Sequence, residues 1–210
     1  LFGALPKSYN QYVDGINQNA NIILDFINDI LDESHIAKGN FHIIEQDVDI
    51  NQLVEKSINN NLTRFSDRKV AIEFKPQGDI PKLRCDNRRI LQALNNIISN
   101  AIKYSHDNTK IEINTYIKKK QIIIKITDQG IGISESDIAI AMAKFGTIKN
   151  KDFNMVESSY GLGLPIVKKL IDAHEGHFRL ESKKNIGTDV TITFPAHRVI
   201  NNNKKSKAKK

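Results

Sequence analysis

The stretch Asp128-Gln-Gly130-Ile-Gly132-Ile133 decides the fold, together with Tyr160-Gly161-Leu-Gly163-Leu164 further along the chain. The first stretch follows the apolar run Gln121–Thr127, and the second opens an amphipathic segment. A strand that ends in a carboxylate and a glycine turn can bring backbone close to a flat ring, and a glycine-rich turn that opens a helix offers bare N–H groups to phosphate. The two stretches together predict a nucleotide pocket that is closed by the loop between them.

The length and composition are those of one globular domain with an appendage. The chain has 210 residues, of which 40% are hydrophobic and 26% charged, and no apolar run is long enough to cross a bilayer. Cys85 is the only cysteine, which excludes an internal disulfide and favours a reducing, cytoplasmic setting. Because the chain begins at Leu1 rather than Met, we expect a piece of a longer protein, and attachment of that protein to a membrane stays open.

Much of the positive charge lies at the C-terminus. The formal net charge is +7, and five lysines lie within the last seven residues, so the rest of the chain carries only +2. We therefore expect residues 198–210 to be a disordered, solvated tail, and we expect no nucleic-acid partner. Binding of nucleic acid by the tail is the weaker alternative. A deletion of residues 201–210 that leaves function unchanged would remove it.

Residues 9–33 have the pattern of one long helix that packs on other helices. Apolar residues recur at alternating spacings of four and three, which is a heptad seam. The seam consists of Ile16, Ala20, Ile23, Ile27 and Ile30. A homodimer joined through residues 12–34 would bury it, and the alternative is a helix that folds onto its own domain.

The rest of the chain mixes helices and strands without a strict βαβ rhythm, which predicts an α+β fold. Strands are expected at residues 41–48, 70–74, 82–85, 110–116, 121–128, 177–182 and 189–194. Helices are expected from the N-cap Asp49 onward, over residues 86–105, after Ser134 and over residues 164–174.

Three polar side chains share one face of the helix expected at 86–105. Asn100 and Lys103 follow Asn96 at spacings of four and seven, so all three point the same way around the axis, apart from the apolar stripe. Amide oxygens suit Mg²⁺, and a lysine ammonium suits phosphate. The alternative is an ordinary solvated face.

Two residues are candidates for contact with a base. Asp128 can accept the exocyclic N–H of adenine, or it can simply cap the glycine turn. Thr188, which follows Gly187, can hydrogen-bond the base directly or through water, or it can be an ordinary strand residue.

Taken together, these motifs resemble the ATP-binding domain of the bacterial sensor histidine kinases, which share the Bergerat ATP-binding α/β sandwich with gyrase, MutL and Hsp90-type ATPases. The likeness runs from about Leu1 to Pro195. Each motif is weak evidence by itself, and the order of the motifs along the chain carries the resemblance. The N box is similar to Asn96–Tyr104, the G1 box to Asp128–Ile133, the F box to Lys144–Gly146, the G2 box to Gly161–Leu164 and the terminal pair to Gly187-Thr188.

The resemblance implies a site for ATP and Mg²⁺. Asn100 would chelate Mg²⁺, and Asn96 and Lys103 would complete the catalytic set. Asp128 would bind the adenine amino group, and residues 147–160 would form the ATP lid. The other positions implied for ATP are Tyr104, Gly130, Gly132, Ile133, Phe145, Gly161, Leu162, Gly163, Leu164 and Thr188.

The resemblance also implies a domain organisation and partners. Residues 1–38 would be the second helix of a dimerisation and phosphotransfer domain, residues 39–197 the catalytic domain, and residues 198–210 the tail. The partners would be a second copy, the receiver domain of a response regulator, and a phosphoacceptor helix outside this chain. None of the six histidines has the acidic residue and proline that follow the family's phosphoacceptor, so the acceptor histidine would be supplied from elsewhere.

Two positions bear on the activity that the resemblance implies. Hydrolytic relatives carry Glu at the position of Asn96, and an amide cannot act as a general base, which favours phosphoryl transfer over hydrolysis. The family usually has Gly and Thr where this chain has Ser159 and Tyr160, and serine adopts a positive φ less readily than glycine. The alternative is therefore a nucleotide-silent scaffold that dimerises and docks a response regulator.

Overall fold

The computed structural model of the chain divides into two compact units, residues 1–41 and residues 42–210. It describes residues 42–146 and 161–200, and scattered positions between Tyr9 and Leu31. The expected lid, with Ser159 and Tyr160, and the tail from residue 201 lie outside the described residues. Among the helices that the structure describes, none has the length and apolar character needed to cross a membrane.

The described positions of the first unit are helical, as the heptad seam predicts. Ile16 is 67% exposed and Ile23 is 54% exposed, and Ile27 and Ile30 of the same seam are exposed as well. The single chain thus leaves this apolar seam in contact with solvent, which is the condition of a helix whose packing partner is another helix.

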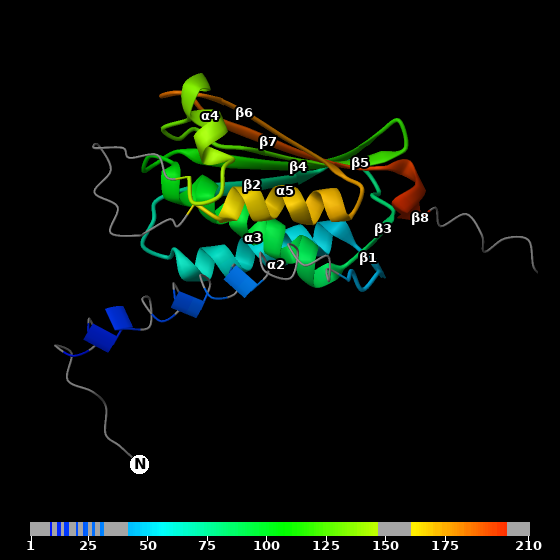
Figure 1. Ribbon diagram of the computed structural model, residues 1–210, viewed down its shortest axis with the longest axis horizontal. Helices are drawn as coiled ribbons and strands as arrows, with labels where there is room; N and C mark the ends of the chain where they lie inside the picture. The colour runs from blue at the N-terminus through cyan, green and yellow to red at the C-terminus, as the bar shows by residue number, and fades with distance from the viewer. Residues whose placement is uncertain are drawn as a thin grey trace, which may run out of the picture. The chain divides into compact units, whose positions relative to one another are not determined.

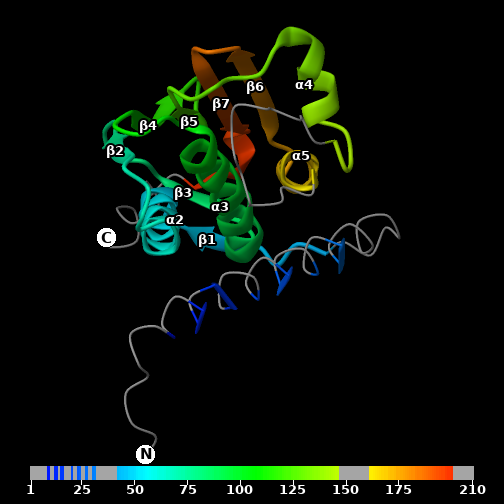
Figure 2. The same cartoon turned by 90° about the vertical axis from the view of Figure 1, so that its left-hand side faces the viewer.

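The second unit is a two-layer α/β sandwich (Figure 1). A five-stranded sheet in the order β2-β4-β5-β7-β6 forms one layer, and helices α2, α3 and α5 cover one of its faces (Figure 2). The strands are β2 Ala71–Pro76, β4 Lys110–Lys118, β5 Gln121–Thr127, β6 His177–Lys183 and β7 Gly187–Phe194. The helices are α2 Ile50–Arg64, α3 Asn87–Tyr104, α4 Glu135–Ala141 and α5 Gly163–Ala173.

The sheet is mixed, which agrees with the fold class expected from the sequence. β2 and β4 pair in parallel, whereas β4, β5, β7 and β6 are antiparallel neighbours. A smaller antiparallel sheet joins three further strands. They are β1 Gln46–Val48, β3 Lys82–Cys85 and β8 Val199–Ile200.

The ends of the domain differ from the expected boundaries. The strand expected over residues 41–48 is limited to Gln46–Val48, and the backbone N–H of Ile44 donates to the Asp86 side chain instead of to a neighbouring strand. Residues 198–200, which were expected in the tail, belong to the domain, because Arg198 is buried in an ion-pair network and the two residues of β8 pair with β3.

The core fills the space between the sheet and the helices because each element is apolar on the facing side. In β4, alternate residues such as Ile111 and Ile113 are fully buried, which is the period of a strand. In α3 the buried residues recur at the spacing of one helical face. They are Ile90, Ala93, Leu94, Ile97, Ile98, Ala101 and Ile102.

Both ends of α3 are closed by side chains. Asp86, the expected first residue of this helix, is its N-cap, and its Oδ1 accepts the N–H groups of Arg88 and Arg89 at 3.0 and 3.2 Å. Its Oδ2 accepts the N–H of Ile44 at 2.9 Å, which attaches the start of the domain to this helix. At the other end, the Arg68 guanidinium donates to the carbonyl of Ser105 at 2.7 Å, where the helix dipole is negative.

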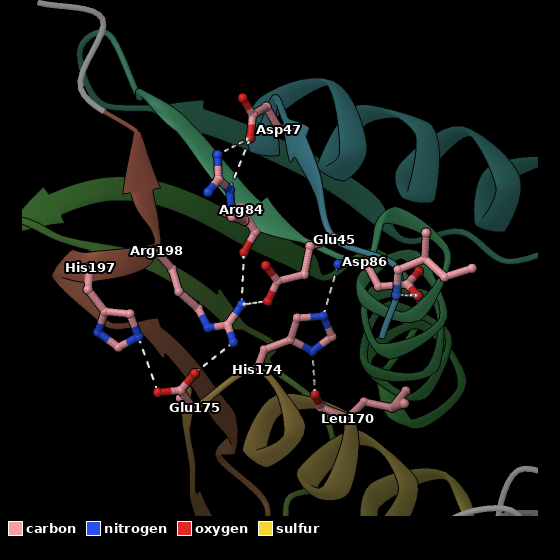
Figure 3. A network of polar contacts seen from close by, with 10 residues as sticks. Glu45, Asp47, Arg84, Asp86, Leu170, His174, Glu175, His197 and Arg198 are labelled. Carbon is pink, nitrogen blue, oxygen red and sulfur yellow. Dashed lines mark hydrogen bonds and ion pairs between the residues drawn. The ribbon is translucent and has the colours of Figure 1, made fainter. Parts of the chain in front are cut away.

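His174 joins the start of α3 to the end of α5 (Figure 3). The N–H of Asp86 donates to His174 Nε2 at 3.0 Å, and His174 Nδ1 lies 2.7 Å from the carbonyl oxygen of Leu170. The ring therefore carries its proton on Nδ1 and is neutral. His174 is fully buried, and burial lowers its pKa below the ordinary value of 6.5.

Arg198 extends this network to the N-terminal edge of the domain (Figure 3). Its side chain is 9% exposed and donates to Glu45 Oε1 and to Glu175 Oε1, each at 2.7 Å. It also donates to the carbonyl oxygen of Arg84 in β3 at 3.2 Å. A single buried guanidinium thus holds together the segment before β1, the strand β3 and the end of α5.

We expect the free energy of unfolding to fall as the pH drops below about 6.5, because the unfolded chain then binds a proton on His174 that the folded chain excludes. Protonation of Nε2 in the folded state would set two N–H donors against each other. Urea denaturation at several pH values between about 8 and 5.5 measures this dependence. His174→Gln should be less stable and should show a flatter dependence on pH.

The matched control is His177→Gln, because His177 lies exposed on the outer face of β6. This variant should keep the pH dependence of the wild type. A His174→Gln variant with the full wild-type dependence would show that the buried ring is not its source.

Candidate nucleotide-binding site

The oxygen-bearing side chains of Asp128, Thr188 and Ser182 lie in a row at one end of the sheet. The register pairs Thr127 with Asp189 across β5 and β7, and it pairs Ser182 with Thr188 across β6 and β7. Asp128 therefore lies beside Thr188, and its N–H donates to the Thr188 carbonyl at 3.0 Å. Side chains in one cross-strand row point to the same face, and for this row it is the face that the helices cover.

Two backbone amides hold the carboxylate of Asp128. The N–H groups of Gly130 and Thr188 both donate to Oδ1, at 2.9 and 3.1 Å. In the part of the chain that the structure describes, Oδ2 accepts no such bond, so it can accept one from a ligand. Burial raises the pKa of Asp128 above its ordinary value, and the two amide hydrogen bonds act in the opposite direction. The turn-capping role and a base-binding role thus use different oxygens of one side chain.

The G1 turn requires glycine at two positions because of close backbone neighbours. Gly132 has a φ of +59°, and a Cβ there would lie 2.0 Å from the carbonyl oxygen of Lys183. A Cβ at Gly130 would lie 2.2 Å from the carbonyl oxygen of Tyr104, which also accepts the N–H of Ile131 at 3.0 Å. The turn is therefore fitted between the end of α3 and the loop from β6 to β7.

The polar face of α3 meets the first turn of α5. A Cβ built on Gly163, the first residue of α5, would lie 3.9 Å from Asn96 Cγ and 4.0 Å from Asn100 Nδ2. Both asparagines are half-buried, so they are not part of a fully solvated face. The structure thus brings together the N box and the G2 box, which are far apart in the sequence.

This junction offers hydrogen-bond donors to a ligand. Asn96 Nδ2 is buried and has no partner among the described residues. No side chain of the described residues caps α5, and its first internal hydrogen bond runs from the Ile166 N–H to the Leu162 carbonyl. The N–H groups of Gly163 and Leu164 precede that bond, and such a helix N-terminus attracts phosphate.

The described residues on either side of segment 147–160 are joined through their backbone. The N–H of Phe145 donates to the carbonyl of Gly161 at 3.0 Å. Gly161 has a φ of +67°, and a Cβ there would lie 2.6 Å from the nitrogen of Gly146. Phe145 itself has a φ of 60°, and it is 63% exposed. The F box and the start of the G2 box therefore form a single junction beside α5.

Lys103 and Tyr104 close the N box at the end of α3. The Lys103 ammonium lies 5.8 Å from the centroid of the Phe65 ring, and the lysine is half-buried. Tyr104 supplies its carbonyl oxygen to the G1 turn. Contact of either side chain with phosphate stays a prediction.

Sequence reasoning missed Ser182. Its hydroxyl accepts the N–H of Ile133 at 2.8 Å and donates to the carbonyl of Gly187 at 2.9 Å, so it connects the G1 box with the terminal pair. The pairing of the two hairpin strands could have identified Ser182. Once strands 177–182 and 189–194 are paired through their short loop, Ser182 falls opposite Thr188.

Comparison with known proteins agrees with this arrangement. The sequence profile of the histidine kinase-, DNA gyrase B- and HSP90-like ATPases matches residues 85–198. The cell-division control histidine kinase PdhS of Brucella canis is 29% identical over 208 residues, which are 95% of this chain and 20% of that protein. The chain thus spans about a fifth of the curated relatives that it matches.

Two solved structures share the fold. Full-length ShkA in complex with AMPPNP matches with a TM-score of 0.74 and 20% identity, over 92% of this chain and 40% of that one. The Acinetobacter baumannii histidine kinase AdeS matches with a TM-score of 0.67 and 22% identity, over 93% and 87% of the two chains. The chain belongs to the family of histidine kinase-, DNA gyrase B- and HSP90-like ATPases, and its resemblance to the ATP-binding domain of sensor histidine kinases is confirmed.

Gly132→Ala should lower the free energy of unfolding by about 3 kcal/mol, for two reasons. The alanine would have to adopt a left-handed backbone conformation, and its Cβ would collide with a carbonyl oxygen. Urea denaturation at neutral pH measures the loss.

Gly78→Ala is the matched control, because Gly78 has a φ of +73° and nothing lies within 4 Å of its Cβ position. The control should lose only about 1 kcal/mol, the cost of the backbone conformation itself. Equal losses at the two positions would mean that the turn can move away from Lys183.

Proposed function

We propose that the chain is the ATP-binding catalytic part of a two-component sensor histidine kinase. It transfers the γ-phosphoryl group of ATP to a histidine that is supplied from outside the chain. The observation that carries this proposal is the junction of α3 with the start of α5, where, among the described residues, no side chain caps α5 and buried Asn96 Nδ2 has no partner. Membership of the ATPase family and the histidine kinase relatives support it.

The phosphates of ATP would lie at this junction. The N–H groups of Gly163 and Leu164 would donate to phosphate oxygens, and the dipole of α5 would favour their negative charge. A buried donor that lacks a partner costs about 1–3 kcal/mol, and a hydrogen bond from Asn96 Nδ2 to a phosphate would remove that penalty. Lys103 would add a positive charge at the end of the same helix face.

Mg²⁺, when bound, would neutralise charge on the phosphates during transfer. Asn100 would hold the ion through its amide oxygen, because Mg²⁺ prefers oxygen ligands and usually binds few protein groups together with water and phosphate. The placement of Asn100 within 4.0 Å of the Gly163 Cβ position fits this role.

The adenine base would lie against the row of Asp128 and Thr188. Asp128 Oδ2 would accept a hydrogen from the exocyclic amino group, while Oδ1 remains bound to the two backbone amides. Gly130 and Gly132 would let the backbone of the G1 turn approach the flat ring. The remaining positions expected to contact ATP are Tyr104, Ile133, Phe145, Gly161 and Leu162.

Transfer is favoured over hydrolysis because Asn96 cannot take a proton from water. The chain would contribute positioning and charge, and the acceptor would be a histidine on a helix that lies outside it. The exposed seam from Ile16 to Ile30 would join two copies, and a response-regulator receiver domain would accept the phosphoryl group from that histidine.

A nucleotide-silent scaffold is the second candidate, and the exposed seam is the observation that favours it. It would dimerise through residues 12–34 and dock a response regulator without using ATP. The two candidates differ in one measurable property, which is the binding of nucleotide.

Calorimetric titration with ADP should show binding that strengthens when Mg²⁺ is present. Asn100→Asp should weaken binding of ADP with Mg²⁺ at least about tenfold, because it sets a carboxylate against the phosphates. Asp128→Ala should weaken binding by about tenfold or more with or without Mg²⁺, because it removes the contact with the base.

Asn59→Asp is the matched control, since it makes the same change on the exposed face of α2 and should bind like the wild type. A wild-type chain that binds no nucleotide at about 1 mM would contradict the kinase proposal and leave the scaffold.

A further inference from the structure

Arg68 contacts the C-terminal end of α3 from the loop that follows α2. Its Nη2 donates to the carbonyl oxygen of Ser105 at 2.7 Å and, at the longer distance of 3.4 Å, to the carbonyl oxygens of Ile102 and Lys103. The last carbonyls of a helix have no partner within the helix, and they carry a partial negative charge. The guanidinium therefore binds these carbonyls and compensates their charge at the same time.

The loop that carries Arg68 is itself held by backbone hydrogen bonds. The N–H of Arg68 donates at 3.0 Å to the carbonyl of Phe65, which is the C-cap of α2 and is buried. The carbonyl of the next residue, Lys69, accepts the N–H of Asn108 at 2.7 Å. The guanidinium thus extends from a backbone that is fixed on both sides, so it can hold the end of α3 in place.

The same end of α3 is the surface against which the G1 turn packs. The Tyr104 carbonyl accepts the Ile131 N–H at 3.0 Å, and the fully buried Ser105 pairs with Gly130 in an antiparallel bridge. The N–H of Gly130 in turn donates to Asp128 Oδ1 at 2.9 Å. The guanidinium and the G1 turn therefore bind neighbouring peptide groups of one short segment.

We propose that Arg68 is a positioning residue of the nucleotide site. It fixes the end of α3 as the support of the G1 turn, and it thereby strengthens the binding of nucleotide through the backbone of Ser105 rather than by contact with the ligand. This inference rests on the proposed nucleotide function and names a residue that lies outside every motif of the site.

The effect on affinity follows from pre-organisation of the site. Without the guanidinium, the carbonyl oxygens at the end of α3 would lose their charged donor, and residues 104–105 could move away from the turn. A nucleotide would then have to order both the helix end and the turn as it binds, and the entropy lost in that ordering would weaken the binding. With Arg68 in place, this ordering is complete before the nucleotide arrives.

The test measures the affinity for ADP by calorimetry in the presence of Mg²⁺. Arg68→Gln removes the charge and shortens the side chain, and it should weaken binding about tenfold, because hydrogen bonds from a charged donor are the stronger ones. Arg68→Lys can replace the single nitrogen that makes all three contacts, but its ammonium is more strongly hydrated. This variant should weaken binding only about threefold.

A proton–nitrogen correlation spectrum of the free Arg68→Gln variant locates the change. The amides of Gly130 and Ile131 should shift from their wild-type positions, because the turn loses its support. The amide of Lys118 should keep its position, since it lies at the opposite end of the pair formed by β4 and β5.

The matched control is Asp49→Ala, which removes the N-cap of α2 at the other end of that helix. It should lower the urea concentration at the midpoint of unfolding. It should nevertheless bind ADP like the wild type, because a chain that stays more than about 99% folded loses almost nothing in apparent affinity. A loss of stability alone therefore does not imitate the effect expected for Arg68→Gln.

An Arg68→Gln variant that binds ADP like the wild type would give Arg68 a purely structural role. It would overturn the inference and leave the proposed function intact. If Arg68→Gln fails to fold, Arg68→Lys decides, and an unchanged affinity of that variant overturns the inference. A wild type that binds no ADP contradicts the proposed function, and the inference falls with it.

Discussion

The antiparallel packing of α3 against α5 is the constraint on which the candidate site depends. At one end, the buried neutral ring of His174 accepts the N–H of Asp86, and this contact fixes the start of α3 to the end of α5. At the other end, Gly163 begins α5 directly opposite Asn96 and Asn100. Protein groups thus complete one end of the helix pair. At the other end, the described residues leave one donor without a partner and the start of α5 without a side-chain cap. That difference makes the second end the place for a phosphate.

The register of strand pairing in the sheet positions the other half of the site. Pairing of β5, β7 and β6 sets Asp128, Thr188 and Ser182 in one row, just beyond the buried core of the same face. Backbone amides and hydroxyls hold this row together before any ligand arrives, so its geometry needs little adjustment on binding. The glycines of the G1 turn add to this rigidity, because the groups packed around them leave no room for a side chain.

Local signals made much of this fold predictable. The apolar stripe of α3 lies within the helix itself, and the glycine turns are marked in the sequence, so both were expected where they are found. The residues that were missed have partners far along the chain. Arg198 binds Glu45, which lies 153 residues before it, and was assigned to the tail. Ser182 became visible as a functional candidate only after the strands were paired. Asp128 was read as either a cap or a ligand, and its two oxygens allow both.

The most direct test of the central claim is a proton–nitrogen correlation spectrum of the labelled chain, recorded as ADP and Mg²⁺ are added. Glycine amides resonate in a separate region, so the two glycine clusters can be followed individually. We expect the largest changes at the amides of Gly130, Gly132, Gly163 and Thr188, and we expect the amides of β2, at the far edge of the sheet, to stay in place. Changes centred on another surface, or none at all at saturating nucleotide, would contradict a nucleotide site between the end of the sheet and the junction of α3 with α5.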